Sequence, residues 1–99
     1  MNSFKIIISE KADKEFSDAL KYYENERKGL GAEFEKEINA IVSLLSEKPL
    51  LFPRKYKRYR EAIVNKFPFF VVYEITISHV IVYSFFHTSR NPKKKYSKK

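Results

Sequence analysis

The pattern of hydrophobic and polar residues predicts a short strand followed by two amphipathic helices. Residues 4–9 form a short run rich in β-branched side chains, which is typical of a strand. Over residues 10–28, and again over residues 31–47, apolar residues recur at spacings of three and four, with charged residues on the opposite face. Ser9 stands where its side chain can cap the first helix by accepting a hydrogen bond from a free backbone N–H.

Two glycines, Gly29 and Gly31, fall between the predicted helices. Glycine adopts the left-handed backbone conformation without the steric penalty of a Cβ atom, so it readily ends a helix. A connection this short makes the two helices antiparallel neighbours that share one apolar face. The sequence therefore predicts a helical hairpin.

The remainder of the pattern predicts three more strands. Pro49 and Pro53 stop helix propagation. Residues 56–66 predict an edge strand, whose lysines would also discourage edge-to-edge aggregation. Residues 69–77 and 80–87 are apolar on both faces near their centres, which places them in the middle of a sheet. Under strict alternation, one face of the final strand would carry Ile81, Tyr83, Phe85 and His87.

Together these elements predict an α+β fold. Its parts are an N-terminal strand, an antiparallel helical hairpin packed on one face of a small, mainly antiparallel sheet, and a basic C-terminal tail. The 99 residues, 43% hydrophobic and 16% aromatic, suffice for one compact domain over residues 1–99, with a tail that can be flexible over about residues 89–99. Because the hairpin covers one face only, we expect an uncovered aromatic surface on the other, available for interaction.

Positive charge changes this picture by indicating the kind of partner. Twenty Lys and Arg residues against twelve Asp and Glu give a formal charge of +8, which favours a nucleic acid or an acidic protein. The charge is concentrated in two clusters beside the predicted strand pair. Candidate nucleic-acid-binding residues are Lys55, Lys57, Arg58 and Arg60 in the first cluster and Lys93, Lys94 and Lys95 in the second. Solvated surface charge is the alternative explanation for any single lysine.

Several classes of protein are excluded or disfavoured. The absence of cysteine excludes disulfides and thiolate metal sites, and there is no glycine-rich phosphate loop. We expect no metal and no cofactor. No signal segment opens the chain and its apolar runs are far shorter than a membrane span, so we expect a soluble, cytoplasmic protein without membrane contact.

The best candidate catalytic set is His87, Arg90 and Tyr96. Metal-independent RNA cleavage needs a base, an acid and a cation beside the phosphate. Histidine can serve as base or acid, and arginine can hold two phosphate oxygens. Tyr96 could stack on an unpaired base. In the structural alternative, His87 is a strand-end histidine bonded to backbone and Arg90 is a surface charge.

The order of these features resembles the RelE/ParE superfamily of toxins from bacterial type II toxin–antitoxin systems. The likeness covers nearly the whole chain. It rests on Tyr22-Tyr23-Glu24, Gly29-Leu30-Gly31 with Phe34, Pro49 with Phe52-Pro53, Arg60, Phe67-Pro68-Phe69 with Tyr73, and His87-x-x-Arg90-x-Pro92. The resemblance implies the fold predicted above. It also implies a growth-inhibiting toxin, bound by a cognate acidic antitoxin, that either cuts messenger RNA on the ribosome or poisons DNA gyrase.

Carried over by position, Arg90 and Tyr96 match residues of the RNA-cleaving branch, and Lys55 to Arg58 resembles its basic patch. Phe70, however, falls where that branch keeps an arginine. The glycine break and the Phe67-Pro68-Phe69 strand look more like the ParE-like, plasmid-stabilisation side. Three functions stay open on this resemblance: a ribosome-dependent messenger RNA endonuclease, a non-enzymatic inhibitor of gyrase, and an inactive relic that binds its antitoxin.

Overall fold

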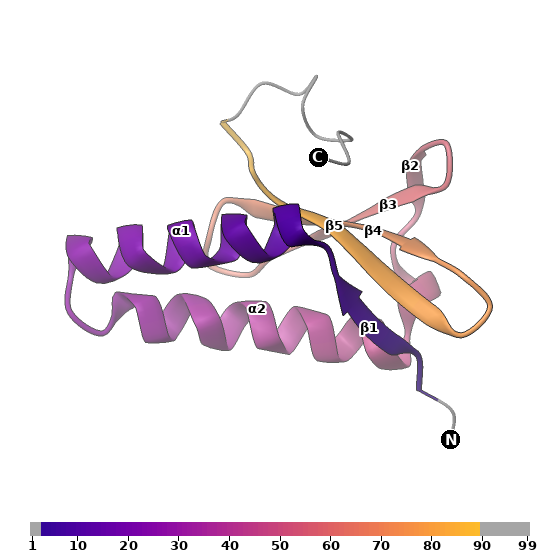
Figure 1. Ribbon diagram of the computed structural model, residues 1–99, viewed down its shortest axis with the longest axis horizontal. Coiled ribbons are helices and arrows are strands. Elements are labelled where there is room, and N and C mark those ends of the chain that lie inside the picture. Colours follow the sequence, from indigo (N-terminus) through magenta and orange to yellow (C-terminus); the bar gives the residue numbers. More distant parts are fainter. Residues whose placement is uncertain (1–2, 90–99) are drawn as a thin grey trace.

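Two antiparallel helices pack on one face of a five-stranded sheet in the computed structural model, which describes residues 3–89 (Figure 1). In chain order the elements are β1 (Lys5–Ile8), α1 (Glu10–Glu26), α2 (Leu30–Glu47), the 3₁₀ turn η1 (Pro49–Leu51), β2 (Arg54–Tyr56), β3 (Tyr59–Ile63), β4 (Phe69–Ile75) and β5 (His79–His87). The predicted α+β architecture is confirmed. Arg90, Tyr96 and Lys93, Lys94 and Lys95 lie outside the described residues.

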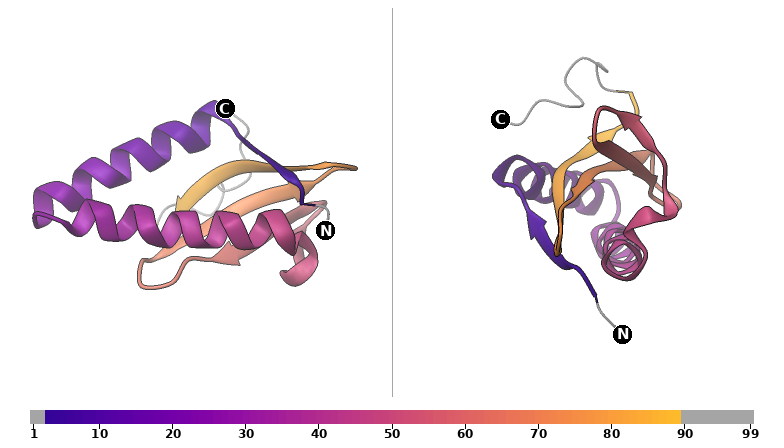
Figure 2. Two further views of the ribbon diagram at one scale, coloured as in Figure 1. Left: turned by 90° about the horizontal axis from the view of Figure 1, so that it is seen from below. Right: turned by 90° about the vertical axis from the view of Figure 1, so that its right-hand side faces the viewer.

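The helical hairpin forms as its sequence predicts. The side chain of Ser9 accepts the backbone N–H of Ala12 at 3.0 Å and so caps α1. Gly29 has φ of 90°, the left-handed conformation, and precedes the first residue of α2. Figure 2 shows both helices on the same side of the sheet.

The sheet is mixed, with strand order β1-β5-β4-β3-β2. β1 lies parallel to β5, and the other three pairings are antiparallel. A parallel pair needs a crossover connection, and the helical hairpin provides part of it. Between helices and sheet lies a core whose members include Phe34, Ile38 and Leu45 from α2 and Val71, Tyr73, Val80 and Val82 from the central strands.

The segment predicted as a single edge strand, residues 56–66, is instead part of a hairpin. β2 forms the outer edge, the chain reverses at residues 57 and 58, and β3 pairs with β4 inside the sheet. Lys57 makes this reversal with φ of 52°. Glycine or asparagine usually occupies such a position, and with Lys57-Arg58 there instead the turn has no recognisable sequence signal.

A bulge in β5 overturns the expected alternation of its side chains. Val72 pairs with Ser84, but the next residue, Tyr73, pairs with Val82, so the register shifts at Tyr83. Val80, Val82 and Phe85 therefore belong to the helix-side core. The prediction that Phe85 and His87 share a face with Ile81 and Tyr83 is wrong, because an extra residue interrupts the alternation.

The carboxylate of Glu15, on α1, holds this bulge in place. Its Oε1 accepts the hydroxyl of Ser84 at 2.8 Å and the backbone N–H of Phe85 at 3.1 Å. A bulge displaces backbone groups from the strand ladder, and a buried N–H without an acceptor is costly. Glu15 is itself only 8% exposed, so this acidic residue is a structural part of the core.

The sheet face opposite the helices is not an open aromatic surface. Val72 and Phe86 are buried there and Phe70 is half-buried. The expectation of an uncovered aromatic surface is therefore wrong. Among the described residues, no helix is long and apolar enough to cross a membrane.

Candidate functional site

The β2–β3 turn carries positive charge and aromatic rings together. We call residues 54–60 the basic hairpin. Lys55, Lys57 and Arg58 are exposed on it. The rings of Tyr56 and Tyr59 lie parallel, with an interplanar angle of 1° and centroids 6.3 Å apart, and the Nζ atom of Lys57 is 5.3 Å from the Tyr56 centroid. This surface can attract a polyanion and offers flat rings for stacking.

A carboxylate on β4 joins the basic hairpin to the central strands. Glu74 is only 9% exposed, and its Oε2 lies 3.2 Å from Nε of Arg58. The hydroxyl of Tyr83 donates to Oε1 of Glu74 at 2.9 Å. Burial, and then the neighbouring Glu74, raise the pKa of Tyr83 to about 12. Arg58 is thereby held against the sheet, while most of its side chain stays exposed.

Arg60 stands apart from the other basic residues of the hairpin. Its Nη1 donates to the backbone carbonyl of Phe52 at 2.7 Å. In register with Arg60, Tyr73 donates its hydroxyl to the carbonyl of Pro49, also at 2.7 Å. Burial raises the pKa of Tyr73 to about 12, and the charge of Arg60 opposes that rise. Both side chains anchor the segment around η1.

His87 closes β5 on the helix side of the sheet. Its ring packs edge-on against Phe69, with centroids 5.1 Å apart. Its Nδ1 accepts the backbone N–H of Ser89 at 3.1 Å and lies 2.7 Å from the Ser89 hydroxyl. A backbone N–H can only donate, so Nδ1 is the acceptor of this hydrogen bond. This geometry fits the structural alternative, a strand-end histidine bonded to backbone.

A cleft of about 410 Å³ adjoins His87. Its lining residues are Glu15, Asp18, Ala19, Tyr22, Tyr23, Phe69, His87 and Ser89. Among residues 3–89, the charged side chains of this lining are the carboxylates of Glu15 and Asp18. Among residues 3–89, no group of three or more His, Cys, Asp or Glu side chains is arranged to hold a metal ion.

The structure brings Lys55, Lys57 and Arg58 together but separates them from His87. His87 pairs with Phe69 at the start of β4, whereas Arg60 pairs with Tyr73, four residues further along that strand. At the usual rise per residue of a strand, Phe69 and Tyr73 are roughly 13 Å apart. Arg58 also lies on the opposite face from His87, because Phe69 is in the helix-side core and alternation points Glu74, the partner of Arg58, the other way.

A second concave surface lies between β1 and the helices, and sequence reasoning missed it. This apolar groove has a volume of about 310 Å³ and is lined by Ile6, Ile8, Asp13, Phe16, Ile38, Asn39, Val42 and Phe85. Ile7 and Ile8 of the adjoining strand are 45% and 38% exposed. The one available signal was a run of three isoleucines in a strand too short to bury them all.

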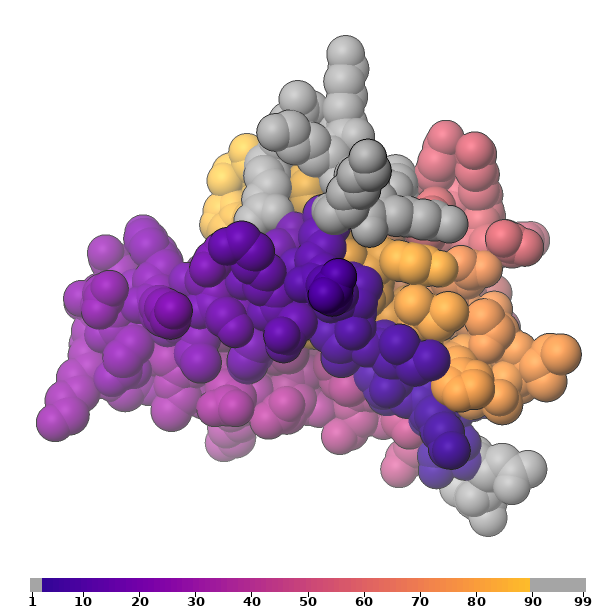
Figure 3. Space-filling model, viewed as in Figure 1, coloured from indigo at the N-terminus to yellow at the C-terminus, as the bar shows by residue number. Residues whose placement is uncertain are grey.

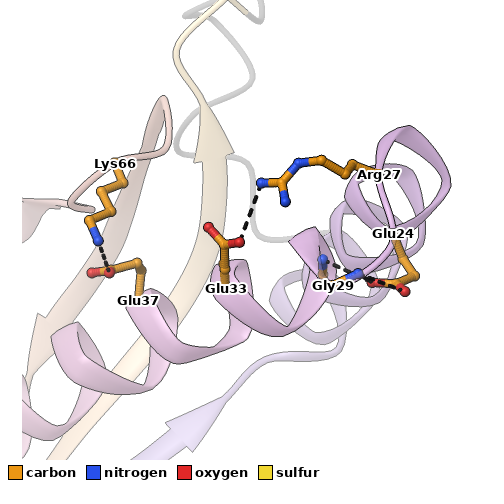
Figure 4. A network of polar contacts seen from close by, with 7 residues as sticks. Glu24, Arg27, Gly29, Glu33, Glu37 and Lys66 are labelled. Carbon is orange, nitrogen blue, oxygen red and sulfur yellow. Dashed lines mark hydrogen bonds and ion pairs between the residues drawn. The ribbon is translucent and has the colours of Figure 1, made fainter.

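Sequence reasoning also missed the role of Glu24. Its carboxylate oxygens accept the backbone N–H groups of Gly29 and Gly31 at 3.1 Å, so a side chain of α1 caps the start of α2 (Figure 4). Two ion pairs in the same view continue along α2, Arg27 with Glu33 at 3.3 Å and Lys66 with Glu37 at 3.7 Å. The signal was present in the sequence, as a glutamate five residues before Gly29.

A family model and a solved structure match this chain. The model of the family described as the ParE toxin of the type II toxin–antitoxin system, parDE, matches residues 6–92. Among solved structures, the chain is similar to the chromosomal ParDE toxin–antitoxin system from P. aeruginosa, with a TM-score of 0.76 at 11% identity over 87% of this chain and 97% of that chain. At this identity the likeness shows the fold alone. No curated protein sequence matches the chain.

Proposed function

Because the chain belongs to the ParE toxin family of type II toxin–antitoxin systems, we propose that it arrests growth by binding its target through the basic hairpin, without cutting RNA. A cognate antitoxin neutralises it. The target that we propose is DNA gyrase, one of the two that the family resemblance implies.

The separation of His87 from the basic hairpin is the observation that carries this proposal. Metal-independent RNA cleavage needs a base, an acid and a cation around one phosphate. Among the described residues, His87 lies opposite Phe69 on the helix side of the sheet, whereas Arg58 is paired with Glu74 on the opposite face. Phe70, at the position where a cleaving relative holds an arginine, is half-buried and in register with Phe86.

Two carboxylates lie on the sheet face opposite the helices. Glu61 and Glu74 are 8% and 9% exposed, and alternation along β3 and β4 points both away from the helix-side core. Glu74 is paired there with Arg58, at 3.2 Å between Oε2 and Nε. The basic hairpin lies at the rim of this face, where its exposed lysines favour an acidic protein surface or the outside of a duplex.

A paired assay tests the proposal. Purified protein is added to a gyrase supercoiling reaction, and messages from induced cells are mapped by primer extension. We expect supercoiling to be inhibited, no cuts in translated messages, and the same activity for His87→Gln. Codon-associated cuts that disappear in His87→Gln would overturn the proposal and favour the endonuclease. Growth arrest with neither activity would show a different target.

A charge-reversal pair tests the surface. Lys55→Glu with Lys57→Glu should abolish growth arrest, because both exposed lysines would then repel an acidic target. Lys21→Glu with Lys36→Glu makes the same change in net charge at exposed positions on the helices and should leave arrest intact. Equal loss of arrest in both variants would mean that net charge, and not the basic hairpin, matters.

A further inference from the structure

Four aromatic rings follow one another along the wall of the cleft beside His87. Tyr22 and Tyr23 of α1 meet edge-on, with centroids 5.3 Å apart and an interplanar angle of 75°. The rings of Tyr23 and Phe69 are 6.3 Å apart at 65°, and those of Phe69 and His87 are 5.1 Å apart at 84°. Aromatic rings gathered around one space attract organic cations to their faces, as aromatic cages do.

The charge of the cleft has the sign that a cation requires. Within the part of the chain that the structure describes, its charged side chains are those of Glu15 and Asp18. Oε1 of Glu15 already accepts two hydrogen bonds from β5, and its Oε2 lies 3.9 Å from Nζ of Lys11. Asp18 contacts Lys14 at 3.3 Å, but both side chains are exposed, and such a pair contributes little. Asp18 is therefore the carboxylate that can exchange its partner for a ligand.

The surface around the cleft extends this negative charge. Residues 10–47 contain ten acidic residues against six Lys and Arg residues, so the helical hairpin has a formal charge of −4. In Figure 3 the yellow end of β5 adjoins the purple surface of α1, and the cleft lies between these two elements. A cation approaching this side of the molecule is attracted by the helices.

The shape of the cleft favours a side chain of a larger partner over a free small molecule. At about 410 Å³ the cleft has room for a whole side chain, and Tyr22 at its lining is 59% exposed. A site for a small molecule usually encloses most of its ligand. A wall that stays in solvent suits a side chain whose backbone remains outside. Arginine fits better than lysine, because its planar guanidinium group stacks on aromatic rings and can hold both oxygens of a carboxylate.

We infer that the cleft receives an arginine side chain of a partner protein. Its guanidinium group stacks on Tyr22 and Tyr23 and pairs with Asp18. The inference does not depend on the proposed function, which concerns the basic hairpin. The chain then has two contact surfaces of opposite charge, the basic hairpin for an acidic partner surface and this cleft for a basic side chain.

A peptide titration of the full chain tests the ligand. The probe is the tripeptide Gly-Arg-Gly, acetylated and amidated at its ends, and the readout is the NMR shift of the backbone amides of Ala19 and Ser89. We expect saturable shifts with a millimolar dissociation constant, as suits a single side chain. The same peptide with citrulline, which has the shape of arginine without its charge, should bind at least about fivefold more weakly. Equal affinity for the two peptides would overturn the inference.

A pair of substitutions on α1 tests the carboxylate. Asp18→Asn removes the charge and keeps the shape, so affinity for the arginine peptide should fall about two- to fivefold. Glu26→Gln makes the same change in net charge at the exposed last residue of the helix and should leave affinity unchanged. Equal weakening in both variants would mean that overall charge, and not the cleft, attracts the peptide.

Two substitutions of Tyr22 test the stacking. Tyr22→Leu keeps an apolar side chain without a ring and should weaken binding about two- to fivefold, whereas Tyr22→Phe keeps the ring and should bind as the wild type does. Both variants should fold, because this side chain is exposed, and thermal unfolding checks this. Equal affinity of the two variants would contradict the stacking of the guanidinium group on this ring.

Two further measurements identify the source of the guanidinium group. If propylguanidinium bound at least about tenfold more tightly than the peptide, the cleft would be a small-molecule site and the inference would be wrong. Arg90 follows Ser89 in sequence, and tighter peptide binding by Arg90→Gln would show that the chain's own arginine competes for the cleft, which would also overturn the inference. A protein that binds the peptide as expected but does not inhibit gyrase would disprove the proposed function and leave this inference standing.

Discussion

Tyr73 joins the central strand to the turn that follows the helices. Its hydroxyl is fully buried and donates to the carbonyl of Pro49. Tyr73→Phe would leave that carbonyl without this donor, and we expect a loss of about 1–2 kcal/mol in the free energy of unfolding. Urea denaturation measures it. Tyr56→Phe, on the exposed hairpin, should change stability little, and equal effects of the two substitutions would contradict the structural role of Tyr73.

Glu15 is the second residue whose removal should be costly. Glu15→Ala leaves both the Ser84 hydroxyl and the Phe85 N–H without their acceptor. We therefore expect a loss of about 2–3 kcal/mol in the free energy of unfolding. Glu15→Gln should lose less, because its amide oxygen can still accept both bonds.

The exposed Asp18 on the same helix provides the comparison for Glu15. Its contact with Lys14, at 3.3 Å, is a surface ion pair, and such pairs contribute little to stability. Asp18→Ala should therefore be nearly neutral in the same urea titration. If Glu15→Ala were equally neutral, the bulge would not depend on that carboxylate.

The two glycines of the helical hairpin have different structural roles. Gly29 needs its positive φ, and nothing lies within 4 Å of where a Cβ would stand. At Gly31 a Cβ would come within 2.9 Å of Oε1 of Glu24 and 3.1 Å of the Leu20 carbonyl. This close approach lets the Glu24 carboxylate reach both backbone N–H groups at the start of α2.

Gly31→Ala should therefore destabilise the hairpin by about 1–3 kcal/mol, since the Leu20 carbonyl is backbone and cannot move freely. Gly29→Asn keeps a residue that tolerates the left-handed conformation and should cost much less. Thermal unfolding of the two variants distinguishes them. A larger loss for Gly29→Asn would mean that backbone conformation, and not helix separation, limits this site.

The helices, the N-terminal cap and the central strands could be predicted from sequence, because their signals are local. Periodicity marks a helix within its own residues, and Ser9 caps a turn only three residues away. The match of the family model confirms the resemblance read from motifs spread along the chain. The bulge could not be foreseen, because its acceptor, Glu15, is 69 residues from Ser84 in sequence.

For the candidate site, the basic cluster at Lys55 to Arg58 was visible as a run of charge. The attachment of this cluster to the sheet could not be predicted, because the ion pair of Arg58 with Glu74 depends on the turn at Lys57. The spacing between His87 and Arg90 carried no information about which face the histidine occupies. That face is set by the shift in register at Tyr83.

The stability of the folded protein should depend on alkaline pH through its buried tyrosines. The pKa values of Tyr73 and Tyr83 rise from 10.0 to about 12 on folding. Between these values the unfolded chain loses phenolic protons that the folded protein keeps. The contribution of these tyrosines to the free energy of unfolding is therefore fully present below about pH 10, and it decreases as the pH rises toward 12. Urea titrations at about pH 9 and about pH 11.5 measure the loss, and Tyr73→Phe should make it smaller.

Charge is distributed unevenly over the fold. Ten of the twelve acidic residues lie in residues 10–47, which form the helical hairpin, whereas the sheet and its connections are strongly basic. The molecule therefore presents two electrically different sides to an approaching partner. A partner with an acidic surface is steered toward the basic hairpin and away from the helices.

The parallel pairing of β1 with β5 also determines when this domain can be completed during synthesis. Ile7 leaves the ribosome early, but its strand partner Ile81 follows more than seventy residues later. Until β5 emerges, the helical hairpin and β1 have no complete sheet to pack against or pair with. Ile6, Ile7 and Ile8 then lack their pairing partners in β5. The nascent chain therefore spends most of its synthesis without the sheet on which the basic hairpin depends. The last strand to be translated within the described residues completes the sheet that supports the basic hairpin.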